Sequence, residues 1–136
     1  MCIFKKAKKN TEVNKAQLSE AELKFNKMWD LWAKGEIKSP YADLMTYQSE
    51  VNNGGHDQFF LNVASTGHLR AVMRSLKHVL PFDIRVPLVE AYNAYKINGE
   101  DAEENEEFFD HADEVFYEKE ELINKILEDY SKKINL

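Results

Sequence analysis

The stretch that decides the fold is Glu50-Val51-Asn52-Asn53-Gly54-Gly55-His56-Asp57-Gln58-Phe59-Phe60-Leu61-Asn62. Asn and Gly tolerate the left-handed backbone conformation that ends a helix, so the Asn52–Gly55 string predicts a break between two helices. On its N-terminal side, we expect a helix to begin at Ser39-Pro40, because proline suits the first helical turn. On its C-terminal side, residues 56–65 have the composition of a short buried helix. The stretch therefore predicts two helices that meet at a sharp junction.

Apolar residues recur with helical spacing on both sides of this junction. They predict a helix over residues 16–34 that Gly35 ends, and a capping box between Ser19 and Glu22 would start it slightly later. Similar patterns predict helices over residues 69–80, residues 83–98 with Asp83 as the cap, residues 108–116 and residues 122–130. No stretch has the length and alternation of a strand. We therefore expect an all-α, compact single-domain bundle of about six to seven helices in residues 15–136.

Charge changes sign along the chain, whose 136 residues carry a net charge of −6. Residues 1–38 hold nine Lys and five acids, residues 39–98 hold five basic and five acidic residues, and residues 99–136 hold four Lys and fourteen acids. The chain is thus basic at its head and strongly acidic at its tail. Lysines near the start make residues 1–14 a flexible basic arm, which we interpret as a solubilising tail; a nucleic-acid-binding arm is the alternative.

Composition and motifs exclude several classes of protein. A single cysteine, Cys2, cannot form an internal disulfide, and no apolar run is long enough for a signal peptide or a membrane span, so we expect a cytoplasmic protein. The four histidines lack metal-ligand spacing, and no known nucleophile, phosphate-binding or dinucleotide-binding motif is present. Asp110 and Asp113 lie one turn apart and could share a divalent ion, but a solvated acidic face is the simpler interpretation. We expect no catalytic residue, metal or cofactor; catalysis by an unfamiliar arrangement is left open.

Residues 50–62, followed by Thr66-Gly67, resemble the signature of the DNA mimic protein family, which is otherwise described as a domain of unknown function. Members share a pattern of the type E-x-x-N-G-G-x-x-Q-F/Y-F-x-N with a turn of small residues after it. Residues 109–117 are similar to the family's acidic and aromatic D-x-x-F/Y-Y region. The resemblance covers about residues 15–130 and implies an all-α fold. It also implies an acidic surface that imitates DNA and occupies a transcription regulator, the role of the member that named the family.

The polar residues of this motif have two interpretations. In the structural one, Gln58 and Asn62 share a helical face and bond the backbone groups freed at the two helix ends. Glu50 then accepts hydrogen bonds from amides of the turn, and Phe59-Phe60 anchors the junction in the core. The alternative is a ligand-binding or active site that adds His56 to the polar residues. The motif residues are Glu50, Asn53, Gly54, Gly55, Gln58, Phe59, Phe60 and Asn62.

Acidic residues are densest in residues 100–107, where six of eight positions are Asp or Glu. A DNA mimic needs carboxylates where a duplex has phosphates, and two helix rows with side chains about 5–6 Å apart approximate such a row of charge. We expect the partner to be a basic DNA-binding protein, such as a helix-turn-helix regulator, and expect no direct contact with nucleic acid. An immunity-type protein that neutralises a basic toxin would carry the same charge, and a homodimer is left open. The candidate partner-binding residues are Glu100, Asp101, Glu103, Glu104, Glu106, Glu107, Asp110, Asp113, Glu114, Glu118, Glu120 and Glu121.

Overall fold

The computed structural model describes residues 17–136, and within that range it contains helices and no strand. The all-α fold class is therefore confirmed. The basic arm expected at residues 1–14 lies outside the described residues. The elements are α3 (Glu20–Ala33), α4 (Tyr41–Ser65), α5 (Leu69–Val79), α6 (Phe82–Asn98), the 3-10 helix η1 (Glu103–Asn105) and α7 (Glu106–Ser131).

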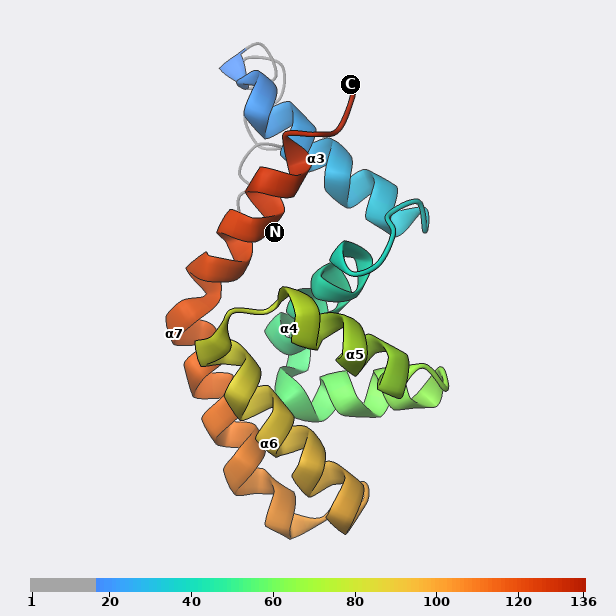
Figure 1. Cartoon of the computed structure of the whole chain (residues 1–136), viewed down its shortest axis with the longest axis vertical. Helices are drawn as coiled ribbons and strands as arrows, with labels where there is room; N and C mark the ends of the chain where they lie inside the picture. Colours follow the sequence, from blue (N-terminus) through green and yellow to red (C-terminus); the bar gives the residue numbers. More distant parts are fainter. Residues whose placement is uncertain (1–16) are drawn as a thin grey trace.

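Helix α7 runs along the long axis of the molecule and contacts most of the other elements. In Figure 1, α6 lies beside the N-terminal half of α7 and α3 lies beside its C-terminal end. The middle of α7 packs against α4, and α5 packs against α4 in turn. Because α4 lies between α5 and α7, it has the largest number of buried residues, ten in all.

Aromatic rings fill the space where α4, α6 and α7 meet. The Tyr47 ring lies edge-on to Phe59 and Phe116, with centroids 5.0 Å and 5.5 Å away. The Phe60 ring stacks on Tyr95 of α6 and on Phe109 of α7, at 5.3 Å and 5.2 Å. Edge-on and offset-stacked rings add about 0.5–1.5 kcal/mol per pair beyond their buried area. The Phe59-Phe60 pair therefore anchors the junction in the core, as expected.

Local sequence signals set several helix ends. The Ser19 hydroxyl accepts a hydrogen bond from the Glu22 amide at 3.1 Å, and the Glu22 carboxylate accepts one from the Ser19 amide at 3.4 Å. This capping box confirms the later of the two predicted starts for α3. Asp83 was expected to cap α6, which is wrong: α6 begins at Phe82, and Asp83 in the first turn pairs with Lys119 of α7 at 3.4 Å.

The described residues form five α-helices, fewer than the six to seven expected. The predicted helices at residues 108–116 and 122–130 are one continuous helix, α7. The turn that joins them packs through polar groups, because Lys119 pairs with Asp83 and Glu120 accepts a hydrogen bond from Gln48. Because this turn has no apolar residue, the apolar pattern is interrupted there and predicts two helices where the structure has one.

The predicted break at Gly54-Gly55 is a kink inside α4. Gly54 has φ −158° and ψ 21°, and Gly55 has φ 74° and ψ −174°, so neither is helical. The residues before and after both glycines are helical. The two helices predicted from the Asn-Gly-Gly string are thus both present, as two arms of one kinked element.

Candidate functional site

Five exposed carboxylates form a single row along α7. They recur at intervals of three or four positions, so they share one face of the helix. The buried residues of the helix, among them Phe109, Phe116 and Ile123, occupy the opposite face. One side of α7 therefore packs in the core while the other presents only acids at these positions. The members of this acidic row are Glu107, Asp110, Glu114, Glu118 and Glu121, all exposed.

Ten of the twelve predicted partner-binding residues are exposed, and two are turned inward. Five of the exposed residues belong to the acidic row, and the other five lie in the segment before α7 and at its first residue. Asp113 and Glu120 are half-buried on the flank of α7 that faces α4. The predicted set thus divides into a solvent-facing group and two internal hydrogen-bond acceptors. The exposed residues before the row are Glu100, Asp101, Glu103, Glu104 and Glu106.

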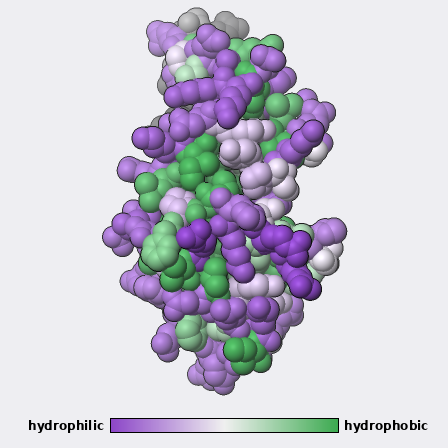
Figure 2. Space-filling model, viewed as in Figure 1, coloured by the Kyte–Doolittle hydropathy of each residue, from purple (hydrophilic) through white to green (hydrophobic). Residues whose placement is uncertain are grey.

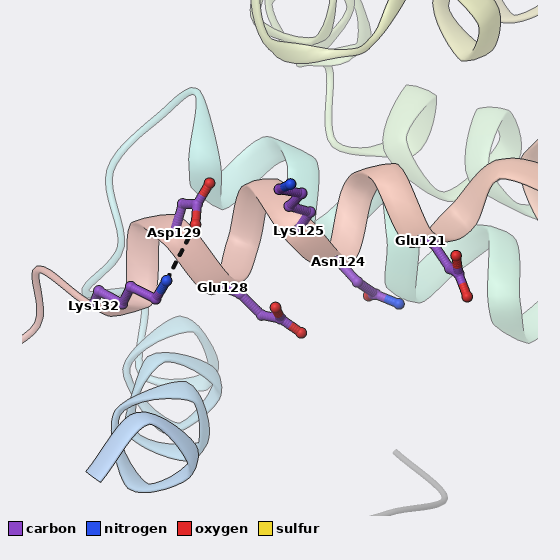
Figure 3. Close-up of a pocket in the computed structure, with 6 residues that line it drawn as sticks. All are labelled: Glu121, Asn124, Lys125, Glu128, Asp129 and Lys132. Carbon is purple, nitrogen blue, oxygen red and sulfur yellow. Dashed lines mark ion pairs between the residues drawn. The ribbon is translucent and has the colours of Figure 1, made fainter.

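Within residues 17–136, no ion pair neutralises the ten exposed acids: the paired acids there are Glu20, Asp83, Asp113 and Asp129. The acidic row ends at Glu121. Beyond it the charge is mixed, and Lys132 pairs with Asp129 at 3.6 Å (Figure 3). A shallow pocket of about 520 Å³ follows this mixed segment of α7. The negative surface is therefore confined to the N-terminal part of α7 and the segment before it.

Behind the row, a buried histidine connects α4 to α7. Nδ1 of His56 lies 2.6 Å from Oδ1 of Asp113, and Nε2 lies 2.6 Å from the Tyr47 hydroxyl. The same Asp113 oxygen accepts the backbone N–H of His56 at 2.8 Å, which satisfies an amide freed by the kink. The carboxylate of α7 thus caps the second arm of α4.

The protons of this group follow from burial. Burial raises the pKa of Tyr47, and the charge of Asp113 adds to the effect, so the hydroxyl keeps its proton and donates to Nε2. Nδ1 of His56 then carries the ring proton and donates to Asp113. Burial lowers the pKa of His56, while the hydrogen bond and the charge of Asp113 oppose that shift. The arrangement at neutral pH is therefore a neutral imidazole between a phenol and a carboxylate.

Close packing explains both glycines of the motif. A Cβ atom at Gly55 would lie 2.7 Å from Oδ2 of Asp113, and Gly55 also has φ +74°. A Cβ atom at Gly54 would lie 2.8 Å from Cβ of Gln58. These distances are too short for real side chains. The kink therefore lets α7 bring Asp113 to the backbone of α4, which a residue with a side chain would prevent.

The amides of the motif bond to Glu50 and not to the backbone. Nδ2 of Asn62 donates to Oε2 of Glu50 at 2.7 Å, and Nε2 of Gln58 donates to the same oxygen at 3.2 Å. The expectation that these amides serve the freed helix ends, and that Glu50 serves the turn, is therefore wrong in its partners. The motif residues bridge the two arms of α4 side chain to side chain; Asn53 is exposed. These hydrogen bonds support the structural interpretation of the motif.

A second polar contact between α4 and α7 was missed from the sequence. Oε2 of Glu120 accepts hydrogen bonds from Gln48 at 2.9 Å and from Asn52 at 2.7 Å. The Tyr117 hydroxyl donates to the carbonyl of Val51 at 2.9 Å. A polar flank with helical spacing was the signal that could have found this contact. Its members on α7 are Asp113, Tyr117, Glu120 and Asn124.

In the part of the chain that is described, neither a helix that could span a membrane nor a cluster of metal-ligating side chains occurs. None of its helices combines the length and the apolar content of a membrane span. Between residues 17 and 136, no three His, Cys, Asp or Glu side chains converge as metal ligands would. The pair considered from the sequence separates: Asp110 is exposed in the acidic row, whereas Asp113 turns toward His56.

The part of the chain that carries these features matches a protein family. The family model described as DMP19-like protein matches residues 40–134. This match spans more than half of the chain and includes both the Gly54-Gly55 kink and the acidic row. No curated protein and no solved structure shows a significant similarity to the chain.

Proposed function

The chain belongs to the DMP19-like protein family, a family of DNA mimics, and we propose that its acidic face occupies a basic DNA-binding protein in place of DNA. The observation that carries the proposal is the acidic row, five exposed carboxylates without a cation partner in the described residues. A transcription regulator is the kind of partner that such a surface fits. Binding is expected to be non-catalytic.

The charge density of the row is of the right order for this role. From Glu107 to Glu121, α7 rises by about 21 Å, at about 1.5 Å per residue. The five carboxylates therefore follow one another at about 5 Å, whereas one DNA strand places a charge every 3.4 Å or so. The row alone has roughly two-thirds of the linear charge of one strand. The five exposed acids before it raise the local charge at the N-terminal end of α7.

The helix that carries the row is held in place by contacts with its neighbours, which supports a binding surface of fixed shape. Asp113 and Glu120 hold α7 to α4, and Lys119 holds it to α6 through Asp83. A partner that docks on the row therefore meets carboxylates whose helix is already in place. A preorganised surface loses less conformational entropy on binding.

The test compares two four-site variants of equal charge. One replaces four acids of the row with amides, and the other does the same to four exposed acids elsewhere. Each takes the net charge from −6 to −2. Each tagged protein is incubated with lysate of the source cell at low and high salt, and retained basic proteins are identified and challenged with duplex DNA. The first variant carries Glu107→Gln, Asp110→Asn, Glu114→Gln and Glu118→Gln, and the second Asp30→Asn, Glu36→Gln, Asp57→Asn and Glu90→Gln.

The proposal expects a basic DNA-binding protein that the natural chain and the second variant retain at low salt. The row variant should lose it, and DNA and high salt should both release it, because the attraction is electrostatic. An equal loss of retention in both variants would mean that net charge matters and the row does not, and full retention by both would mean that the row is not the binding surface. Recovery of a basic nuclease or another toxin, which DNA fails to displace, would favour an immunity-type role instead.

A further inference from the structure

All three arginines of the chain lie on two successive helices, α5 and α6. They are Arg70 and Arg74 on α5 and Arg85 on α6. Lysine supplies the other fifteen basic residues. No acid occurs between Thr66 and Phe82. Arginine differs from lysine in its planar fork of donors, which suits two-point binding of a carboxylate or phosphate. Its concentration here is therefore a feature to explain in a chain whose net charge is −6.

These cations are available to a partner. Arg70, Arg74 and Lys77 follow one another at intervals of four and three residues on the exposed face of α5. None of them, nor Arg85, forms an ion pair with another described residue. In Figure 2, the most hydrophilic side chains of this view lie over α5 and the first turns of α6. The basic face, as we call these four residues, is thus unneutralised within residues 17–136.

An apolar element lies next to the cations. Lys77 and Arg85 line a shallow pocket of about 400 Å³ together with Val86 and Val89. Phe82 is 66% exposed at the edge of the same helix, and the Arg85 guanidinium lies 5.6 Å from the centroid of its ring. Phenylalanine and arginine are enriched at the centres of protein interfaces, and the two valines add apolar surface beside them.

The arginine at the pocket is held in position. Nη1 of Arg85 donates a hydrogen bond to the carbonyl of Lys77 at 3.2 Å. That carbonyl lies in the last turn of α5, where the helix leaves carbonyls without partners and favours a cation. Since one nitrogen is used in this way, the guanidinium is oriented while its other donors are free to bind. The pocket therefore places the oriented guanidinium of Arg85 next to the apolar side chains of Val86 and Val89.

From this geometry we infer a second docking surface, on α5 and the start of α6, for a protein segment that carries carboxylates around an apolar side chain. The carboxylates bind Arg70, Arg74 and Lys77, and the apolar side chain enters the pocket between Val86 and Val89. Charge complementarity selects an acidic partner. The valine floor and Phe82 favour a protein segment over a nucleic acid, because a phosphate backbone has nothing apolar to place there. The surface is independent of the acidic row and does not rest on the proposed function.

The probe for this surface is a fluorescein-labelled synthetic peptide of twelve residues or so, with glutamates flanking two central leucines. A second peptide has serines in place of the leucines, and a short duplex DNA carries the same label. Fluorescence anisotropy measures binding to the natural protein and to three variants. The variants are Arg74→Gln/Lys77→Gln, Val86→Ser, and Lys125→Gln/Lys133→Gln, a control with the same loss of charge on exposed lysines of α7 and of the turn that follows it.

The natural protein and the control should bind the leucine peptide about tenfold more tightly than the serine peptide, the effect of burying one apolar side chain. The Arg74→Gln/Lys77→Gln variant should bind it about fivefold more weakly, because two exposed ion pairs are lost. Val86→Ser should weaken the leucine peptide and leave the serine peptide unchanged. Because these residues are exposed or half-buried, circular dichroism should show that every variant folds.

Three results would overturn the inference. One is equal affinity for the two peptides. Another is binding of the duplex DNA that matches the leucine peptide and falls in the same variants, which would make the surface a general anion site. The last is self-association of the unlabelled protein that the Arg74→Gln/Lys77→Gln change abolishes, which would identify a second copy of the chain as the occupant.

Discussion

Replacement of Gly55 by alanine tests whether the kink in α4 and the close approach of Asp113 require a glycine at this position. Two costs add at this position. The backbone, at φ 74° and ψ −174°, lies in a region that is essentially restricted to glycine, which costs a residue with a side chain about 1–3 kcal/mol. The new Cβ atom would also lie 2.7 Å from Oδ2 of Asp113, so the carboxylate must move away from the His56 amide that it caps. Leaving that buried donor without a partner costs about 1–3 kcal/mol more.

Gly99 provides a matched control. It has nearly the same backbone conformation, φ 84° and ψ 178°, but a Cβ atom there would meet no other atom within 4 Å. Gly99→Ala should therefore show the backbone cost alone, and Gly55→Ala should lose about 2–6 kcal/mol in total. For a chain of this length, 1 kcal/mol corresponds to about 4 °C in the melting temperature. Gly55→Ala should thus melt roughly 4–12 °C below Gly99→Ala.

The assay is thermal unfolding followed by circular dichroism at 222 nm, with urea unfolding as the second measure of free energy. Asp113→Ala in the Gly55→Ala background separates the two costs, because it removes the clash. When Asp113 is already alanine, the loss caused by Gly55→Ala should shrink to the loss seen for Gly99→Ala. Equal melting temperatures for the two single glycine variants would refute the reasoning, because the approach of Asp113 would then place no demand on Gly55.

Three further predictions concern the packing of α7 on α4. Because the pKa of His56 is lowered in the folded state, the unfolded chain binds a proton more readily than the folded one. The free energy of unfolding should therefore be level above pH 6.5 or so and fall as the pH drops through the folded pKa. Urea unfolding at each pH should show that the His56→Gln variant loses this pH dependence and that the exposed His111→Gln variant keeps it. Phe116→Ala removes a fully buried ring and should cost about 3–5 kcal/mol in urea unfolding; a loss below 1 kcal/mol or so would contradict the packing described. Glu120→Ala removes an acceptor shared by Gln48 and Asn52 and should cost about 1–2 kcal/mol, with faster hydrogen exchange in the middle of α7; unchanged exchange would mean that this contact does not hold the helix.

The kink in α4 was predictable because its cause is local. The Asn-Asn-Gly-Gly string predicts a break from residue type alone, and the break lies at its two glycines, of which Gly55 has the positive φ that favours glycine. The same holds for the start of α3, where Ser19 and Glu22 satisfy each other across one turn. Burial of Phe59 and Phe60 followed from their apolar character next to the break.

The partners of polar groups were not predictable in this way. The sequence placed Gln58, Asn62 and Glu50 at the junction, yet which of them would bond to which depended on how the two arms of α4 meet. Asp113 looked like one more exposed acid among many, and only the docking of α7 on α4 turned it toward His56. Local spacing can mark a polar flank of α7, but it does not identify a hydrogen-bond partner 57 positions away.

The sequence by itself determined that the described chain is helical, that α4 breaks at its two glycines, and that acids crowd the C-terminal third. These are properties of residue type and near-neighbour spacing. The tertiary structure decided that α7 is continuous, because the polar turn at Lys119 and Glu120 is satisfied by side chains of α6 and α4. Only a continuous helix aligns five acids into one row and keeps Asp113 and Glu120 apart from it. The amount of negative charge therefore follows from the sequence, whereas the arrangement of that charge on the surface is set by packing.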